Sequence, residues 1–260
     1  MKLNSKISLG LIFLAALVWA GCQTTQYPSS YLSSTGPNPA LVADFDGGLL
    51  VNSSLAEADK PGNHVRVAGP ILLGTYDSSV VTLAPSVLSL GAPGYNGVGQ
   101  SAHVTGSFHD AANGKYPALS LEIALEAANK YYDASLFTGV KFYIMVASAD
   151  VAALRSFSIP IGLTTVAASG GICDQPPFTS ASNPCYNSFG TSFTNTNGIW
   201  KPVVLTFASL TRGNYGPTIS PATLSGTNLQ QILMLDWSEG NSNAAGDVNV
   251  DFSVDQVEFF

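Results

Sequence analysis

Short apolar segments, each bounded by turn-forming residues, recur along most of the chain. They are rich in β-branched or aromatic residues, and Gly, Pro, Asn or Asp stands at their ends, which is typical of β-strands. Two other segments, 54–60 and 150–154, are predicted to form at most a turn of helix. Many short strands at nearly regular spacing predict an all-β protein, a two-sheet β-sandwich of the jelly-roll type. The predicted strands cover residues 41–47, 64–72, 99–108, 118–127, 139–148, 155–162, 200–207, 231–237 and 247–260.

Alternation within two strands predicts which side chains face the core. Between Val140 and Val146 every second residue is apolar and shares one face, so Lys141, Tyr143 and Met145 must share the other face. That second face is half apolar, which favours a sheet covered by a loop or a ligand, or simply a second covered face without a ligand. In the last strand the apolar alternation changes phase after Val254, and this predicts a β-bulge near Asp255 and Gln256.

The N-terminus has the pattern of a secretory signal peptide. Lys2 and Lys6 precede an apolar run at 7–19, and small residues follow it. The run is too short to cross a bilayer comfortably and lacks basic stop-transfer flanks, so a retained membrane helix is the weaker interpretation. We therefore expect a signal peptide at 1–21, a polar tether at 22–39 and one β-domain at 40–260.

Cys22 stands at the expected cleavage position, as in a bacterial lipobox. Trp19 occupies a position where an aliphatic residue is usual, so ordinary cleavage nearby is the alternative to lipidation of Cys22. Gln23 gives no inner-membrane retention signal. The prediction is a lipid-anchored protein of the bacterial outer membrane, on its periplasmic or cell-surface face.

The remaining two cysteines, Cys173 and Cys185, lie in a loop rich in Gly, Pro, Ser and Asn. In an oxidising compartment they are predicted to form a disulfide, which would contribute roughly 3 kcal/mol. Zinc binding and redox catalysis are the alternatives. Neither is favoured, because the histidines show no ligand spacing with these cysteines and there is no CxxC motif.

The charge of the chain restricts its partners. Loss of Lys2 and Lys6 with the leader would leave 8 basic residues against 17 acidic ones, a formal charge of −9. Such a surface argues against nucleic acid and anionic lipid as partners, so we expect membrane contact only through the lipid anchor. It permits cations and neutral ligands.

Four segments together resemble a known family. They are 43–47 (ADFDG), 132–142 (YDASLFTGVKF), 198–210 (GIWKPVVLTFASL) and 251–259 (DFSVDQVEF). Their order and spacing are similar to those of galactose-binding-like jelly rolls, in particular family-11-type carbohydrate-binding modules and complex I intermediate-associated domains. The resemblance spans about residues 41–260, and the cysteine-containing loop before Trp200 resembles one found in secreted bacterial members.

This resemblance implies a structural calcium ion held by acidic residues of the first and last strands. Asp44 or Asp46 and Asp255 stand at those positions, and carboxylates are hard oxygen ligands that suit Ca²⁺. The alternative is that Asp44 and Asp46 only form a turn before Gly47 and Gly48.

The resemblance also implies carbohydrate binding through aromatic rings that stack on sugar faces and polar groups that bind hydroxyls. For each candidate a simpler role remains open: Trp237, like Trp200, is predicted to be core, and the loop tyrosines could be turn residues. Arg155, or Lys141, is the candidate for polar contacts. The aromatic candidates are Tyr76, Tyr95, Tyr143, Tyr215 and Trp237.

Catalysis is not favoured by the residues. Glu122 and Glu126 share one face of a predicted strand, but Ala124 stands where jelly-roll glycoside hydrolases carry a central Asp. Their Cα atoms would be roughly 13 Å apart, whereas the carboxyl groups of glycosidases are at most about 10 Å apart. There is no GxSxG motif either. We expect a non-catalytic, surface-anchored carbohydrate-binding lipoprotein; a structural or adhesion lipoprotein with a protein partner is the alternative, and a glycoside hydrolase ranks third.

Overall fold

The fold was analysed in a computed structural model of the chain. It describes residues 41–45, 50–51, 54–55, 71–76, 81–91, 93–110, 118–125, 131–147, 154–161, 188–212, 223–240 and 246–260. Within these residues almost all regular structure is β-strand, together with three short 3₁₀ helices: η3 (Tyr95–Gly97), η5 (Phe207–Ser209) and η6 (Gly226–Gln231). No helix among them is long and apolar enough to span a membrane.

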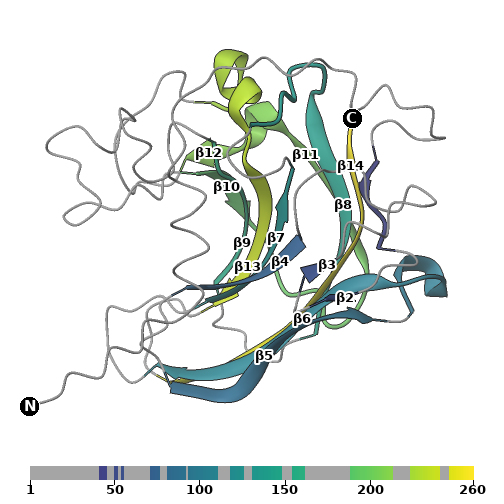
Figure 1. Cartoon of the computed structure of the whole chain (residues 1–260), viewed down its shortest axis with the longest axis vertical. Coiled ribbons are helices and arrows are strands. Elements are labelled where there is room, and N and C mark those ends of the chain that lie inside the picture. Colours follow the sequence, from purple (N-terminus) through teal and green to yellow (C-terminus); the bar gives the residue numbers. More distant parts are fainter. Residues whose placement is uncertain are drawn as a thin grey trace, which may run out of the picture.

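The described strands form two antiparallel sheets that face each other, as Figure 1 shows. Sheet A has the order β11-β8-β14-β6-β5, and β1 (Leu41–Ala43) adds to the end of β14. Its strands are β5 (Val81–Gly91), β6 (Ser101–Asp110), β8 (Gly139–Val146), β11 (Lys201–Thr206) and β14 (Gly246–Phe259).

Sheet B has the order β12-β10-β9-β13-β7-β4-β3-β2. It is curved, and its hollow side faces away from sheet A (Figure 1). Its strands are β2 (Leu50–Val51), β3 (Ser54–Leu55), β4 (Ile71–Tyr76), β7 (Ala118–Ala124), β9 (Leu154–Ile159), β10 (Phe189–Ser192), β12 (Thr211–Arg212) and β13 (Met234–Gly240). The prediction of a two-sheet β-sandwich is confirmed.

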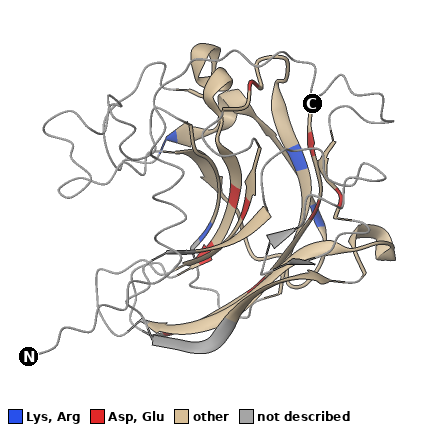
Figure 2. Ribbon diagram, in the orientation of Figure 1, with Lys and Arg blue, Asp and Glu red and all other residues tan. Residues whose placement is uncertain are grey.

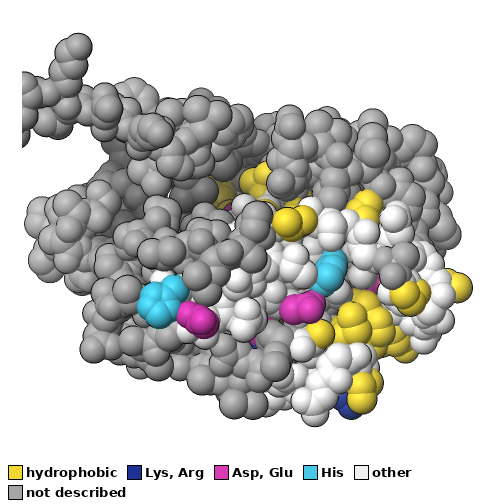
Figure 3. Space-filling model, turned by 90° about the horizontal axis from the view of Figure 1, so that it is seen from below, with side chains coloured by type: hydrophobic (Ala, Val, Ile, Leu, Met, Phe, Trp, Pro, Cys, Tyr) yellow, Lys and Arg dark blue, Asp and Glu magenta, His cyan; other side chains and the backbone are white. Residues whose placement is uncertain are grey.

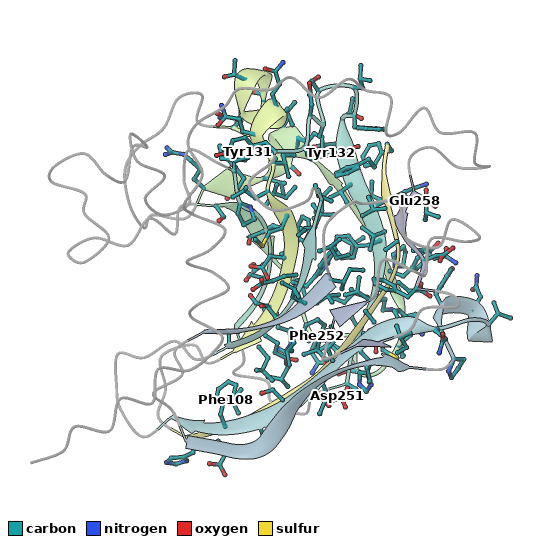
Figure 4. The ribbon with its side chains drawn as sticks, viewed as in Figure 1. Phe108, Tyr131, Tyr132, Asp251, Phe252 and Glu258 are labelled. Atoms are coloured by element: carbon teal, nitrogen blue, oxygen red, sulfur yellow. The ribbon has the colours of Figure 1, made fainter. Side chains whose placement is uncertain are left out.

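The core lies between the sheets and follows the predicted alternation. In β8 the apolar set Val140, Phe142, Ile144 and Val146 is buried, while the alternate residues are more exposed. Phe142 packs against Phe157 of β9 and Trp237 of β13, with ring centroids 5.2 Å away in both cases. Figure 4 shows Phe108 and Phe252 pointing between the sheets, whereas Asp251 and Glu258 lie on the outer side of β14.

The predicted β-bulge in the last strand is confirmed. The pairing of β14 with β8 changes register between Asp255 and Glu258, and Gln256 has a φ of 47°. Val257 lies three residues after the buried Val254, so regular alternation would turn Val257 and Phe259 outward. The register shift turns both back into the core. Beyond the bulge, β14 pairs with β1 on the side where β6 has ended.

The structure differs from the predictions at the ends of several segments and at one strand that was not predicted. Ser54 and Leu55 belong to strand β3 and Leu154 belongs to β9, while the other residues of the segments 54–60 and 150–154 lie outside the described part of the chain. The strand predicted at 231–237 starts only at Met234, because residues 226–231 form η6. Strand β5 was missed because it contains Pro85, which interrupts a typical strand pattern; β5 lies at the edge of sheet A, where proline is tolerated.

Candidate functional site

Three aromatic side chains meet on the outer face of sheet A. Tyr143 of β8 points away from the core, and the ring of Tyr95 from η3 stacks on it with centroids 3.4 Å apart and planes at 17°. Trp200, just before β11, meets Tyr95 edge-on at 6.4 Å. We call Tyr95, Tyr143 and Trp200 the aromatic platform. All three side chains are half-buried, so Trp200 is not the core residue that the sequence suggested.

The loop that carries Tyr95 is held against the bulge of β14. The backbone N–H of Tyr95 donates a hydrogen bond of 2.7 Å to Oδ2 of Asp255, and the N–H of Gln256 donates one of 2.7 Å to Oδ1. A Cβ on Gly94 would lie 2.7–2.8 Å from the carbonyl oxygens of Val98 and Gln100 and from Asp255 Oδ2. The absence of a side chain at Gly94 therefore lets the loop close tightly and fixes Tyr95 in position.

Charged side chains border the aromatic platform in pairs. Lys141, two residues before Tyr143 on the same face, forms a 2.8 Å ion pair with Glu258. On β6 and β14, His103 Nε2 lies 2.8 Å from Asp251 Oδ1. Figure 3 shows hydrophobic side chains gathered beside a histidine–aspartate pair on this side of the molecule. The outer face of sheet A thus combines flat rings with paired polar groups.

A second cluster lies on the hollow, outer face of sheet B. Glu122 of β7 stands directly opposite Asp236 of β13, and Asp236 in turn stands opposite Ser158 of β9. Acidic residues lie side by side on these strands in Figure 2. The serine hydroxyls are hydrogen-bonded within the cluster: Ser120 to Glu122 at 3.0 Å, Ser158 to Asp236 at 3.2 Å and Ser156 to Ser238 at 2.7 Å. We call this set the serine–acid face: Ser120, Glu122, Ser156, Ser158, Asp236 and Ser238.

The serine–acid face differs from ordinary solvated sheet surface in its burial. Glu122 and Asp236 are only 9% and 6% exposed, while Ser156, Ser158 and Ser238 are half-buried. Burial raises the pKa of the Glu122 carboxyl, and the hydrogen bond from Ser120 lowers it by a smaller amount. The Glu122 carboxyl lies across Gly74 of β4, where any Cβ would collide with it. The two acids are therefore fixed in place beneath the more accessible hydroxyls.

The structure brings together two of the predicted ligand-binding residues, Tyr95 and Tyr143. Tyr76 is placed in β4, opposite Ala118, and Tyr215 lies outside the described residues. His103 and His109 lie at the surface, with side chains that are 30% and 43% exposed.

Two predicted ligand-binding residues are core residues instead. Trp237 is fully buried and packs against Phe142 and Phe157. Arg155 is 4% exposed, and its Nη2 lies 2.7 Å from Oε1 of the fully buried Glu239. Both side chains project from the inner face of sheet B, so neither can reach a ligand. Polar and apolar residues alternate along this segment. Arg155 is two residues before Phe157 and therefore shares the inward face with Phe157 and Ile159, which could have been predicted from the sequence.

Of the predicted calcium ligands, Asp44 and Asp255 are described and Asp46 is not. Ala43 pairs with Val257, which places Asp44 at the end of β1 beside the bulge that carries Asp255. Within the part of the chain that the structure describes, no group of three or more His, Cys, Asp or Glu side chains could hold a metal. Cys22, Cys173 and Cys185 also lie outside the described residues.

Sequence reasoning missed most of the serine–acid face. Glu122 was considered only with Glu126, which lies outside the described residues; the structure pairs Glu122 with Asp236 instead. A signal did exist, because Ser156 and Ser158 alternate with core residues in β9, as Asp236 and Ser238 do in β13. Such alternation identifies an outer face, but it does not show which strands lie side by side.

No protein-family model matches the sequence, and neither does any curated protein sequence. Among solved structures, its neighbours include family 11 carbohydrate-binding modules, the class that the sequence resembles. One is the module from Clostridium thermocellum in complex with a β-1,3-1,4-mixed-linked tetrasaccharide, with 15% identity over 85% of this chain and 94% of that chain, at a TM-score of 0.47.

Two further solved structures are similar to this chain. The family 11 module of the cellulosomal cellulase Lic26A-Cel5E of Clostridium thermocellum has 16% identity over 72% of this chain and 86% of that chain, with a TM-score of 0.42. A β-1,2-glucanase from Parabacteroides distasonis has 11% identity, and the match covers 85% of this chain and 24% of the glucanase, with a TM-score of 0.41.

Proposed function

We propose that this protein is a non-catalytic carbohydrate-binding protein that holds a neutral glycan on the serine–acid face of sheet B. The observation that carries the proposal is the cross-strand pair Glu122–Asp236 with serine hydroxyls hydrogen-bonded to both carboxyl groups. Hydroxyl groups can both donate and accept hydrogen bonds, which is the requirement for binding the hydroxyls of a sugar. The buried Asp236 carboxyl orients the half-buried Ser158, whereas Ser120 is itself fully buried and holds the Glu122 carboxyl in place.

The same face offers apolar contact for the ring faces of a sugar. Leu72 of β4 stands opposite Glu122, and Met234 of β13 is two residues before Asp236, so both share this side of the sheet. Both side chains are half-buried. Apolar surface with a few well-placed polar groups is the usual composition of a small-ligand site. The curvature of the sheet suits an extended chain of several sugars.

Binding without catalysis is supported by the arrangement of the two acids. Each carboxyl group is buried and hydrogen-bonded to a serine, and Glu122 is packed across Gly74. A glycosidase needs its two carboxyl groups on either side of the scissile bond, with access to substrate and water. Glu122 and Asp236 stand next to each other within one sheet face, so it is their burial and their serine partners, and not their spacing, that favour the role of orienting groups.

Affinity electrophoresis in gels that contain mixed-linkage β-1,3-1,4-glucan, β-1,2-glucan or agarose tests this function. Retardation of the protein in one of these gels is expected, with no reducing ends released during prolonged incubation. The double substitution Ser158→Ala/Ser238→Ala should lower the affinity that is calculated from the retardation about tenfold, since each lost hydrogen bond contributes about 0.5–1.5 kcal/mol. The matched control is Ser89→Ala/Ser107→Ala, which removes two half-buried hydroxyls from the strands β5 and β6 of sheet A. Equal mobility in all gels would contradict the proposal.

The proposal includes the anchor that the N-terminal sequence predicts. Lipidated Cys22 and the polar segment 23–39 would hold the domain at the outer membrane, where an acidic protein meets neutral glycans without needing charge complementarity. Mass spectrometry of the membrane fraction tests this, since an acylated N-terminal cysteine has a defined mass increment. Cys22→Ser should release the protein from the membrane, and an unmodified residue at position 22 in the membrane fraction would contradict the anchor.

Calcium is proposed as a structural ion beside the bulge of β14. The carbonyl oxygens of Val98 and Gln100 and the carboxylate of Asp255 converge around Gly94, in a cradle that a Cβ would fill. These are the hard oxygen donors that Ca²⁺ prefers, and Asp255 would supply the negative charge together with Asp44 from the adjacent β1. The ion would brace the loop that carries Tyr95 against the sheet.

A further inference from the structure

The aromatic platform lies on the opposite side of the sandwich from the serine–acid face. Its rings project from the outer face of sheet A, whereas Phe142 and Ile144, the chain neighbours of Tyr143, fill the core. Strand β8 is held between β11 and β14 by its backbone pairing, and the loop of Tyr95 is held by its hydrogen bond to Asp255, so neither element depends on the stacked rings alone. The platform therefore calls for a functional explanation of its own.

We propose that the aromatic platform is a second glycan-binding site, on which a neutral sugar ring stacks. Sugar rings have an apolar face and a polar rim, and aromatic side chains bind that face by flat contact. Tyr95 covers one face of Tyr143, so the sugar would stack on the outer side of this ring pair, beside Trp200. The apolar rim extends through Val98, Ile199 and Val204, which are 69%, 58% and 65% exposed.

The platform is rigid before any ligand binds. Tyr95 is fixed by the hydrogen bond from its backbone N–H to the buried Asp255, and Tyr143 stands on a strand paired on both sides. The hydrogen bond with Tyr95 is the main cause that raises the pKa of Tyr143, and this bond helps to hold the two rings together. Pre-organisation of this kind lowers the entropic cost of binding.

Charge favours a neutral sugar over an ionic partner. Lys141 is paired with Glu258, two residues from Tyr143 on the same face. His103 of β6 is paired with Asp251 of β14. Ser253 of β14 stands between His103 of β6 and Met145 of β8, so this pair lies on the same face as the platform. Paired groups present hydrogen-bonding atoms with little net field, which suits the hydroxyl rim of a sugar.

This second site goes beyond the proposed function, because it would let one domain bind glycan on two opposite faces and so join two chains. Affinity electrophoresis in the three polysaccharide gels tests it with Tyr95→Ala/Tyr143→Ala. About tenfold weaker retardation is expected from the lost stacking surface, and Val87→Ala, which trims an exposed apolar side chain of the same sheet, should change nothing. Thermal unfolding of each variant checks that it folds.

Trp200 gives an independent readout that leaves the tyrosines intact. Soluble mixed-linkage β-1,3-1,4-glucan, β-1,2-glucan and agaro-oligosaccharides should quench its emission when one of them stacks on the platform. Trp200→Phe should remove that change while the buried Trp237 still reports a folded protein. An emission that no glycan alters, in a protein that the gels do retard, would overturn the second site.

The two sets of variants separate the two proposals. If the sheet A variant and the Ser158→Ala/Ser238→Ala variant each lose part of the retardation, both sites bind. Loss only in the serine variant overturns the platform and leaves the proposed function standing, whereas loss only in the tyrosine variant supports the platform and contradicts the serine–acid face. No retardation of the wild type contradicts both. If the wild type self-associates and Tyr95→Ala abolishes the self-association, the platform binds a second copy of the chain. That result would overturn its role as a glycan site.

Discussion

Glu122 on β7 stands directly opposite Asp236 on β13, so two carboxyl groups occupy neighbouring positions on the same face of sheet B. Directly opposite residues of an antiparallel pair have Cβ atoms about 4.5–5.5 Å apart. Like charges at this separation repel each other, and burial of both residues adds a desolvation cost. The serine hydroxyls that bind these carboxyl groups offset part of that cost.

The raised pKa of Glu122 predicts how stability depends on pH. In the unfolded chain its pKa returns to about 4.5, so above that pH the folded protein holds the proton more tightly than the unfolded one does. The contribution of Glu122 to the free energy of unfolding is therefore lost as pH rises from about 4.5 through its pKa in the folded state. Glu122→Gln should remove this loss and make the protein more stable than the wild type at neutral pH.

Urea denaturation between pH 4 and pH 8 measures this difference. The gap between Glu122→Gln and the wild type should widen with rising pH and then level off. Asp133→Asn is the control, since it neutralises a half-buried carboxyl whose hydrogen bond from the backbone N–H of Ser135 the amide oxygen can keep. Parallel curves for the wild type and Glu122→Gln would show that the environment of Glu122 does not hold its proton.

The Arg155–Glu239 ion pair is expected to be essential to the fold. Glu239 is fully buried, and its Oε2 also accepts a 3.3 Å hydrogen bond from the backbone N–H of Asp251 in the opposite sheet. Arg155→Met would leave a buried carboxylate without its cation, which costs about 3–5 kcal/mol. Lys141→Met breaks the exposed pair with Glu258 and should cost at most about 1 kcal/mol. Chemical denaturation of both variants measures how much stability each loses. Equal losses would contradict the expected difference between the buried and the exposed ion pair.

Calcium should stabilise the domain through Asp255. An ion present at a hundred times its dissociation constant adds about 2.7 kcal/mol to the free energy of unfolding. We expect a higher melting temperature in excess Ca²⁺ than in a chelator, and Asp255→Asn should remove the difference. Asp251→Asn, four residues earlier on the same strand, should retain it. A wild-type melting curve that is identical with Ca²⁺ and with chelator would contradict the site.

The disulfide between Cys173 and Cys185 is predicted to stabilise the domain by roughly 3 kcal/mol. Cys173→Ser, Cys185→Ser and the double variant should lose the same amount, because each removes the same single bond. Thiol titration of the unreduced, unfolded protein should find neither residue reactive. Zinc in the purified protein that is lost in either single variant would point to metal binding instead.

Much of the fold could be predicted because local alternation encodes it. The inward set of β8 and the bulge of β14 were both read from the order of apolar residues, and both are confirmed. Strand β5 was not predicted. A strand can contain Pro85 when it lies at the edge of a sheet, and only the sheet order shows that β5 lies there. Arg155 was misassigned because a charged residue is rarely buried without a partner, and its partner Glu239 lies 84 positions away in the sequence.

The sequence by itself determined the β-class of this protein and which side chains of a strand share a face, because the period of two is a local property of extended backbone. Only the tertiary structure decided that Tyr95 stacks on Tyr143 and that Glu122 meets Asp236. These contacts join segments that are far apart in the chain. They depend on strand order and register, which are set by the packing of the whole sandwich and not by any one segment.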